Sequence, residues 1–443
     1  LTTGQHVAVL AENSTAWIIA FLGAIAGGAV AVPLATRVAT DEIDVLLEHA
    51  GTDVIAVDDA LLPLVEARWR DRVLRLTPPG AVDSQDVQRE VVRGVGNAPA
   101  CLTYTSGTTS RPKGVLLRNS SLTRASECYA AIFHSTPDLR TVVAVPLCHN
   151  TGFVDQLGHT LVAGGSIEVH RRFRAEQIAA ALQSGACSYF IGVPTMYHRI
   201  LEHLADAPPC TLSPWLAFGG APMPSQLIAR LQRQFPNAPL ANCYGLSEAT
   251  SITHINFVGT GSVATEVGVA VAGTIDRISS AGELLIRSPT AMLGYHRNPE
   301  ATAAKFEDGW LRTGDLASRD DDGMVHIYGR IDDVINRGGE KVVPLEVEEA
   351  LCDHPAIVEA AVVGLPDVEY GTIVVAAVVT SEPIASTTLD RYLEGCLADY
   401  KRPAQIVMVD RLPRNENGKV LAGRVRDLVG QMLASQQEQQ GQQ

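Results

Sequence analysis

The sequence has little that points to zinc or disulfide chemistry. Its 8 cysteines are scattered and none forms a CxxC pair, so we expect neither a disulfide framework nor a structural zinc site. No HExxH stretch occurs, and His198 and His203 are five residues apart, a spacing that splays side chains across a helix. Free thiols fit a reducing compartment, so we expect a cytoplasmic protein. The first residue is leucine and no signal peptide precedes the fold, which leaves open whether the natural N-terminus is included.

The sequence also lacks an excess of basic residues. Its formal net charge is -14, which argues against nucleic acid as the main partner. The basic clusters at Arg171–Arg174 and Lys401–Arg402 are short, and we interpret both as solvated faces.

A transmembrane helix is not expected, although one stretch could suggest it. Residues 16–35 carry no charge and are numerous enough to span a bilayer. However, Gly27, Gly28 and Pro33 interrupt the run, and residues 12–14 offer a helix N-cap just before it. We therefore expect a buried helix that ends at the glycines, followed by a short strand, and no integral membrane association.

What remains is the composition of a packed globular protein, with 46% hydrophobic and 19% charged residues. At 443 residues the chain exceeds one ordinary core, so we expect two or three domains of roughly 100–200 residues each. We expect strands at 7–10, 53–57, 141–146, 166–170 and 188–194, and helices at 175–185 and 195–205. This alternation predicts an α/β fold with parallel sheets covered by helices.

The pattern changes near Leu284 to antiparallel strands and tight glycine or Asp-Gly turns. A small βαβ unit is expected next, with a helix beginning at Pro344 and a strand at 357–364. With a boundary near Arg330–Asp333, we expect a large N-terminal α/β domain at residues 1–331, which includes a small β-barrel-like part. A small mobile α+β C-terminal domain would cover 332–433, and the polar residues 434–443 are expected to be disordered.

Tyr104 to Gly114 reads YTSGTTSRPKG, which is nearly all hydrogen-bond donors with little bulk. Strand-like sequences flank it, so Thr105–Lys113 is expected to be a loop between two strands. Glycines let backbone N–H groups approach a ligand, hydroxyls add donors, and Lys113 adds a positive charge, a combination that suits phosphate oxygens. A Ser/Thr-rich surface turn would have the same composition. The loop is not a GxxxxGK[ST] loop, because glycine follows the lysine.

Other stretches carry matching chemistry. NCYGLSEAT, residues 242–250, holds an aromatic ring, a hydroxyl and a carboxylate, although Ala249 rules out a GxSxG nucleophile elbow. RTGDL places Asp315 beside a glycine turn, GRIDDVINRGGEKV begins with a glycine and Arg330, and PRNENGKV ends near Lys419.

Together these motifs resemble those of the adenylate-forming superfamily, which includes acyl-CoA synthetases, 4-coumarate–CoA ligases, luciferases and the adenylation domains of peptide synthetases. YTSGTTSRPKG, YGLSEA, RTGD, GRIDDVINRGGEKV and PRNENGK match its core motifs in order and spacing, over residues of about 4 to 430. The resemblance implies ATP, Mg²⁺ and CoA as cosubstrates, and an acid–thiol ligase that makes an acyl-adenylate and then a thioester.

The resemblance also implies roles for individual residues. For the β- and γ-phosphates of ATP it implies Thr105, Ser106, Gly107, Thr108, Thr109 and Lys113. For the remainder of the nucleotide it implies Gly220, Ala221 and Tyr244 around adenine, Ser247 near the α-phosphate, and Asp315 and Arg330 at the ribose, with Gly245 also in the nucleotide site. Glu248 would hold Mg²⁺, and Lys419 would reach both the substrate carboxylate and the α-phosphate. Donors and a lysine for phosphate, and a glutamate for a hard cation, agree with the chemistry of these side chains.

Two steps at one site imply a rearrangement, and Asp332 stands at the hinge position of the family. Rotation there would remove Lys419 and bring residues 336–341 to the thiol donor. The CoA-binding residues implied are Arg337, Gly338, Gly339 and Glu340.

The sequence indicates less about the identity of the carboxylic acid substrate. Residues 216–224, LAFGGAPMP, contain no carboxylate to hold an ammonium group, which disfavours a free α-amino acid. His149 stands where acyl- and aryl-activating relatives carry a histidine, and could also be a core residue. The amide of Asn150 could bond an ortho-hydroxyl. The acyl pocket implied comprises His149, Asn150, Phe153, Val193, Phe218 and Gly219.

We therefore predict an acyl-CoA synthetase for a fatty or aryl carboxylic acid, acting as a monomer or homodimer. One alternative is a stand-alone aryl-acid adenylation enzyme that loads the phosphopantetheine of a carrier protein. Another is a non-catalytic nucleotide-binding relative, which the presence of Glu248, Asp315, Arg330 and Lys419 disfavours.

Overall fold

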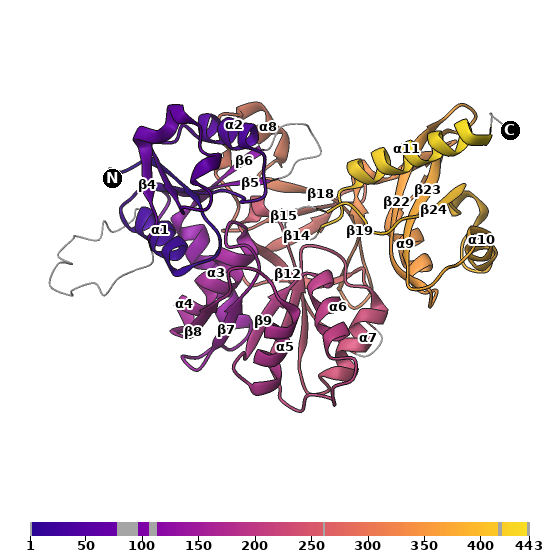
Figure 1. The fold of residues 1–443 in the computed structure, drawn as a ribbon, viewed down its shortest axis with the longest axis horizontal. Coiled ribbons are helices and arrows are strands. Elements are labelled where there is room, and N and C mark those ends of the chain that lie inside the picture. The colour runs from indigo at the N-terminus through magenta and orange to yellow at the C-terminus, as the bar shows by residue number, and fades with distance from the viewer. Residues whose placement is uncertain (1, 78–95, 106–112, 260–261, 415–418, 441–443) are drawn as a thin grey trace.

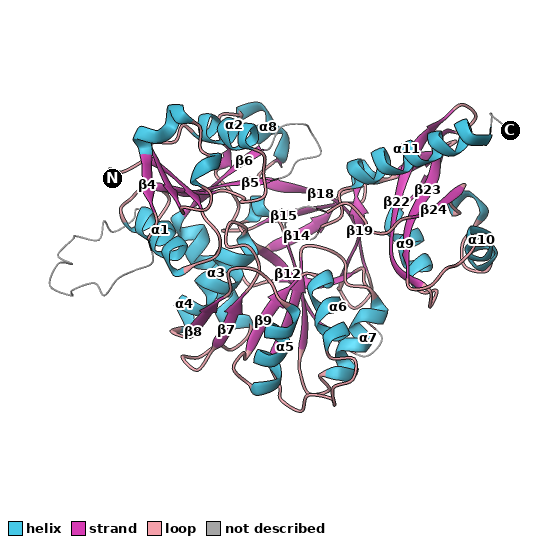
Figure 2. Cartoon of the chain, in the orientation of Figure 1, coloured by secondary structure: helices cyan, strands magenta, loops and turns pink. Residues whose placement is uncertain are grey.

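The computed structural model describes residues 2–77, 96–105, 113–259, 262–414 and 419–440. A larger part carries sheets covered by helices, and a smaller part formed by the C-terminal residues stands to one side of it (Figures 1 and 2). The smaller part has buried apolar clusters of its own, which include Val374, Val378 and Val425. The structure therefore has the α/β architecture and the separate C-terminal domain that the sequence predicts.

The first sheet has the strand order β16-β6-β5-β2-β1-β3-β4. Its N-terminal strands are parallel, and β6 and β16 add to one edge in antiparallel fashion. The strands are β1 (His6–Leu10), β2 (Val30–Pro33), β3 (Val54–Val57), β4 (Val73–Arg75), β5 (Pro99–Thr105), β6 (Lys113–Arg118) and β16 (Gly294–Tyr295). The accompanying helices are α1 (Thr15–Ala26), α2 (Thr40–Ala50), α3 (Asn119–Ile132) and α8 (Pro299–Lys305).

Helix α1 accounts for the long apolar run. The Ser14 hydroxyl caps it by accepting a hydrogen bond from the Trp17 N–H at 3.1 Å, as the sequence predicts. The helix ends at Ala26, and Gly28 adopts a positive φ of 76° before β2 begins. Among the residues that the structure describes, no helix combines the length and the apolar character needed to cross a bilayer.

The second sheet begins with parallel strands, in the order β8-β7-β9-β10-β11. These strands are β7 (Arg140–Val143), β8 (Ser166–Val169), β9 (Tyr189–Gly192), β10 (Trp215–Gly219) and β11 (Leu240–Gly245). The helices between them are α4 (His159–Ala163), α5 (Ala175–Ser184), α6 (Pro194–His203) and α7 (Ser225–Gln234), and a π-helix, η4 (Thr151–Gly158), precedes α4. The predicted strands at 141–146 and 188–194 are thus shorter than expected.

Antiparallel strands continue this sheet in the order β12-β13-β19-β18-β15-β14, where we expected a small barrel-like part. They are β12 (Ile252–Phe257), β13 (Glu266–Ala270), β14 (Ile275–Ile278), β15 (Glu283–Arg287), β18 (Trp310–Arg319) and β19 (Val325–Arg330), with β17 (Phe306–Glu307) paired to β18. This arrangement brings β18 and β19 next to the ends of β11 and β16, where the motif residues lie.

The C-terminal domain begins with a hairpin of β20 (Ile335–Arg337) and β21 (Glu340–Val342). Its main sheet, β22-β23-β24, comprises β22 (Ile357–Asp367), β23 (Gly371–Thr380) and β24 (Gln405–Met408), with helices α9 (Pro344–Cys352), α10 (Ser386–Glu394) and α11 (Ala422–Gln440). The predicted helix and strand are present, but β22 pairs antiparallel with β23. The parallel βαβ connection is instead β23–α10–β24, so the prediction placed it one element too early.

The end of the chain differs from the prediction. Residues 434–443 were expected to be disordered, whereas α11 continues to Gln440 and residues 441–443 lie outside the described part. Glutamine, glutamate and alanine all have good helix propensity, so a polar, repetitive composition can extend a helix that packing has already started.

Candidate active site

The strands that flank the hydroxyl-rich loop pair as the sequence predicts. Thr105 of β5 lies opposite Lys113 of β6, and Tyr104 lies opposite Gly114. The predicted phosphate ligands Ser106, Gly107, Thr108 and Thr109 lie outside the described residues. The Lys113 ammonium lies 5.4 Å from the centroid of the Tyr295 ring, so the base of the loop faces β16.

A tight turn after β11 positions Ser247 and Glu248. A Cβ on Gly245 would lie 1.9 Å from the Ser251 carbonyl oxygen, so only glycine fits where β11 meets the returning β12. Residues Ser247–Ala249 then form one 3₁₀ turn, η5, which ends at Thr250 with a positive φ of 70°. This geometry leaves Ser247 and Glu248 partly exposed at the end of the sheet.

Tyr295 connects two of the predicted ATP-site residues. Its hydroxyl donates to Glu248 Oε1 at 2.6 Å, and its ring is the one that lies below Lys113. Burial and the Glu248 carboxylate raise the pKa of Tyr295, so the phenol stays protonated and acts as a donor. Tyr295 could not be predicted from the sequence, because GYHRNP has no periodicity or charge pattern that marks it.

Tyr244, Asp315 and Arg330 meet at one point although they come from three strands. Asp315 of β18 lies opposite Arg330 of β19, and Arg330 Nη1 is 3.2 Å from Asp315 Oδ1. The Tyr244 hydroxyl donates to Asp315 Oδ2. Burial and Asp315 raise the pKa of Tyr244 well above its ordinary value, so it too remains a donor. The carboxylate of Asp315 is thus held between a cation and a phenol.

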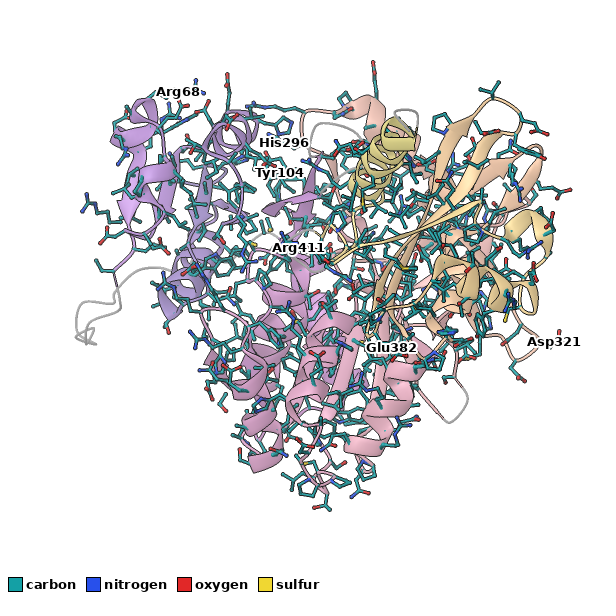
Figure 3. The ribbon with its side chains drawn as sticks, turned by 45° about the vertical axis from the view of Figure 1, so that its right-hand side comes forward. Arg68, Tyr104, His296, Asp321, Glu382 and Arg411 are labelled. Atoms are coloured by element: carbon teal, nitrogen blue, oxygen red, sulfur yellow. The ribbon has the colours of Figure 1, made fainter. Side chains whose placement is uncertain are left out.

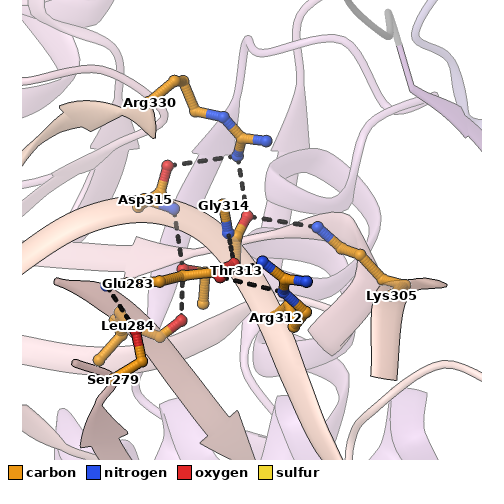
Figure 4. A network of polar contacts seen from close by, with 9 residues as sticks. All are labelled: Ser279, Glu283, Leu284, Lys305, Arg312, Thr313, Gly314, Asp315 and Arg330. Carbon is orange, nitrogen blue, oxygen red and sulfur yellow. Dashed lines mark hydrogen bonds and ion pairs between the residues drawn. The ribbon is translucent and has the colours of Figure 1, made fainter. Parts of the chain in front are cut away.

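The turn before Asp315 is held by a network of hydrogen bonds (Figure 4). Arg330 Nη1 donates to the Thr313 carbonyl at 3.0 Å, and the Asp315 N–H donates to Thr313 Oγ1 at 3.0 Å. The Gly314 N–H donates to the carboxylate of Glu283 at 2.9 Å. Gly314 has a φ of 80°, and a Cβ there would lie 2.7 Å from Arg330 Nη2. The turn therefore favours glycine in RTGD because of its positive φ, and a Cβ there would also displace the Arg330 guanidinium.

Gly219 ends β10, and Gly220 follows it. Gly219 lies opposite Cys243 of β11, and a Cβ on Gly219 would lie 2.5 Å from the Cys243 carbonyl oxygen. Gly220 has a φ of 77°, with Val193 Cγ1 3.7 Å from the position of a Cβ. Gly220, predicted for the adenine pocket, and Gly219 and Val193, predicted for the acyl pocket, therefore lie together at the carboxyl end of the parallel strands, where open α/β sheets bind ligands.

His149 and Asn150 precede the π-helix η4. Burial lowers the pKa of His149 to about 4, so the imidazole is neutral at neutral pH. Within the described residues, its buried Nε2 atom has no hydrogen-bond partner. The Asn150 amide donates through Nδ2 to the Thr250 carbonyl, so this end of the amide is occupied by the backbone.

Two of the predicted pocket residues lie in hydrophobic cores. Phe153 is buried, and its ring is 5.2 Å from that of Phe21. Phe218 is fully buried in the core of the second sheet. This packing is a sufficient explanation of both side chains, and a role in the acyl pocket remains a prediction.

The predicted hinge and CoA residues begin the C-terminal domain. Asp332 is exposed in η6 (Ile331–Asp333), between β19 and β20. Arg337 donates to the carbonyls of Asp399 and Tyr400 at 3.1 and 3.0 Å, and Gly338 and Gly339 have positive φ between β20 and β21. Glu340 is exposed at the start of β21.

Lys419 also belongs to the C-terminal domain. It is exposed and precedes Val420, which pairs with Arg414 in an isolated β-bridge before α11.

Two family models match the chain. The model described as AMP-binding enzyme matches residues 1–296, and the AMP-binding enzyme C-terminal domain matches residues 346–419. The chain belongs to the AMP-binding enzyme family. Similar proteins include a feruloyl-CoA synthase from Amycolatopsis sp., 33% identical over 96% of this chain and 89% of that protein.

Solved structures of similar proteins agree with this family membership. ATP-bound MatB from Rhodopseudomonas palustris is 28% identical, with a TM-score of 0.87 over 97% of this chain and 89% of that one. O-succinylbenzoate coenzyme A synthetase from Bacillus subtilis, in complex with ATP and a magnesium ion, is 27% identical, with a TM-score of 0.82 over 96% and 89%. The chain is thus an AMP-forming acid–thiol ligase, and members of this family that act as CoA ligases use ATP and CoA as substrates.

In this AMP-binding enzyme the structure brings together Lys113, Tyr244, Glu248, Asp315 and Arg330, which are separated widely in the sequence. Charges of Asp315, Glu248 and Asp332 all act to raise the pKa of Arg330 against the effect of burial. The cluster therefore combines carboxylates, cations and phenolic donors within one region, as a triphosphate with its ribose requires.

Proposed function

We propose that this AMP-binding enzyme activates an apolar or aryl carboxylic acid with ATP and transfers the acyl group to CoA. The observation that carries the proposal is the convergence of Tyr244, Glu248, Asp315 and Arg330 next to Lys113. Support also comes from the similarity to a feruloyl-CoA synthase and to 2-succinylbenzoate–CoA ligases.

In this proposal ATP lies across the ends of β5, β11, β18 and β19. Lys113 and the hydroxyl-rich loop would bind the β- and γ-phosphates, while Asp315 and Arg330 would bind the ribose. Glu248 presents a partly exposed carboxylate, which is the type of ligand that Mg²⁺ prefers, so the residues present fit this ion. When bound, Mg²⁺ would withdraw negative charge from the phosphate oxygens. Tyr295 would orient Glu248 through its 2.6 Å hydrogen bond.

The first step brings two anions together. A carboxylate oxygen attacks the α-phosphorus, the bond to pyrophosphate breaks, and an acyl-adenylate forms. Lys419 would place its ammonium between the carboxylate and the α-phosphate and so lower the repulsion. Loss of one such preorganised charge contact costs roughly 2–4 kcal/mol of barrier, or about 10²–10³ in rate.

The second step needs a thiol where Lys419 had been. The thiolate of CoA attacks the acyl carbon, the bond to the AMP oxygen breaks, and the thioester and AMP are released. Rotation at Asp332 would exchange Lys419 for the β20–β21 hairpin, which carries Arg337, Gly338, Gly339 and Glu340.

The acid would lie near His149. The imidazole of His149 is neutral, and its buried Nε2 atom has no hydrogen-bond partner within the described residues. It could therefore donate one hydrogen bond to the substrate carboxylate as an uncharged donor. No carboxylate occurs in residues 216–224, which disfavours an amino acid with a free ammonium group.

A panel of carboxylic acids tests the proposal, with pyrophosphate release measured in the presence and absence of CoA. We expect release with fatty or aryl acids and thioester formation when CoA is added. Thioester formation only with an acyl or aryl carrier protein would show that the enzyme loads a carrier. If no acid supports pyrophosphate exchange, the chain is a non-catalytic nucleotide-binding relative.

A further inference from the structure

Lys305 is a half-buried lysine for which no motif accounts. Lysine occurs at only five positions of the chain, where arginine supplies most of the positive charge, and the other four are Lys113, Lys341, Lys401 and Lys419. An ammonium is a compact point charge with three donors, so a lysine is not equivalent to an arginine in a crowded site.

The local fold directs Lys305 to the Asp315 turn. Lys305 is the last residue of α8, where the helix dipole favours a cation, and the chain enters β17 immediately afterwards. Phe306 of β17 lies opposite Leu311 of β18, so the pairing places Lys305 beside the next residues of β18. The Lys305 ammonium donates to the Thr313 carbonyl at 3.3 Å.

The same carbonyl oxygen also accepts the hydrogen bond from Arg330 Nη1. In Figure 4 the dashed lines from Lys305 and Arg330 end on this one atom. A carbonyl oxygen has two lone pairs, so Thr313 can satisfy both cations at once. Arg330 in turn pairs with Asp315, the predicted ribose ligand.

Lys305 adds a positive charge to a region that contains three carboxylates. Burial lowers the pKa of Lys305 and Arg330 acts in the same direction, whereas the carboxylates of Glu248, Asp315 and Glu283 favour its charged form. Within the described residues Lys305 makes no ion pair, while Glu283 pairs with Arg312 and Asp315 pairs with Arg330.

We propose that Lys305 is a positioning residue for ATP, which holds the Thr313–Asp315 turn and adds a positive charge to a site that contains three carboxylates. This inference rests on the proposed function, because it requires ATP at the Asp315–Arg330 pair. Without Lys305, the Thr313 carbonyl loses one of its two donors and the site loses one positive charge. A loss of positive charge weakens the binding of a polyphosphate.

Titration calorimetry with MgATP tests this inference without knowledge of the acid. Lys305→Met keeps the length of the side chain and removes its charge, whereas Lys305→Arg keeps the charge and adds bulk. We expect the Kd for MgATP to rise roughly tenfold in Lys305→Met, which corresponds to the loss of one charge-assisted hydrogen bond. Lys305→Arg should stay within about threefold of the wild type. Arg287→Met is the matched control, because exposed Arg287 on β15 also donates to a backbone carbonyl, that of Asp308.

If Lys305 acts in packing alone, the Kd for MgATP should be unchanged in Lys305→Met and raised in Lys305→Arg. This result would overturn the inference. If Lys305→Met unfolds at a lower temperature than the wild type, the affinity of Lys305→Arg for MgATP decides whether the charge matters. If Lys305→Arg binds MgATP as weakly as Lys305→Met does, a role for the charge is excluded. Failure of the wild type to bind MgATP would refute the proposed function itself. Once an acid is known, the KM for ATP should rise in Lys305→Met while kcat at saturating ATP changes little.

Discussion

Replacing Asp315 with asparagine tests the centre of the nucleotide site. The change removes one negative charge and hardly alters the volume of the side chain. In the wild type, Asp315 accepts hydrogen bonds from the Tyr244 hydroxyl and from Arg330 Nη1. The asparagine carbonyl can still accept one of them, so we expect a folded protein in which Arg330 has lost its counter-charge.

The expected loss of stability in Asp315→Asn follows from the solvent exposure of the Asp315–Arg330 ion pair. The side chain of Asp315 is 11% exposed and that of Arg330 is 36% exposed, so solvent screens part of the interaction. We take about 1 kcal/mol for the ion pair, between a surface bridge and a buried one. A further loss of about 1 kcal/mol is expected because the hydrogen bond from the Tyr244 hydroxyl would be accepted by a neutral amide and no longer by a carboxylate. The free energy of unfolding should fall by about 2 kcal/mol, which lowers the Tm by roughly 4 °C.

Binding of MgATP should weaken more than stability does. If Asp315 holds the ribose, the loss of a charge-assisted hydrogen bond raises the Kd roughly 10- to 30-fold. Asp321→Asn is the control, because it makes the same chemical change in the exposed turn between β18 and β19, and Figure 3 shows Asp321 pointing outward at the edge of the molecule. An unchanged Kd in Asp315→Asn, with a Tm loss as expected, would refute the assignment of Asp315 to the nucleotide.

Three further changes address the other parts of the site, and a fourth addresses the buried carboxyl of Asp155 in η4. Asp332→Pro should spare acid-dependent pyrophosphate exchange and abolish thioester formation, since a proline stiffens the η6 hinge; loss of both together rejects Asp332 as the hinge. Lys419→Ala should do the opposite, slowing adenylation about 10²–10³-fold while still converting supplied acyl-adenylate to thioester. Tyr295→Phe should raise the magnesium concentration needed for half-maximal activity roughly threefold, because Glu248 loses one orienting hydrogen bond, and an unchanged requirement would separate Tyr295 from metal binding. Burial raises the pKa of Asp155 from 3.8 to about 7, so folding takes up a proton between these pH values and the contribution of Asp155 to stability falls as the pH rises from about 4 to about 7. The urea midpoint of Asp155→Asn relative to wild type should therefore increase over this range and level off above it. A constant difference would contradict the buried carboxyl.

Much of the site could be predicted from the sequence, because its motifs are local. The glycines of YGLSEA and RTGD are required by their local geometry. A Cβ on Gly245 would clash with the backbone of Ser251, and Gly314 has a positive φ of 80°. The Ser14 cap and the helix start at Pro344 are equally local. Such features depend on short-range sterics and hydrogen bonds, so a short stretch of sequence contains them.

Contacts between distant segments could not be predicted in the same way. Tyr295 and Lys305 carry no sequence signal, and each matters only because β16 and α8 fold against β6 and β18. The parallel connection of the C-terminal domain and the helical end of the chain were also predicted incorrectly. Strand order and helix extension depend on which apolar faces bury each other, and composition is nearly the same for either outcome.

The family could be recognised from the sequence, and so could the turns that present the motif residues. The positions of Asp315 opposite Arg330, of Tyr244 on the same carboxylate, and of Lys305 and Arg330 on one carbonyl became visible only in the folded molecule. The difference arises from the distance along the sequence over which the interactions act. A turn is decided by sterics over a few residues, whereas charge balance in a half-buried site is decided by strands that pair across long separations in the sequence.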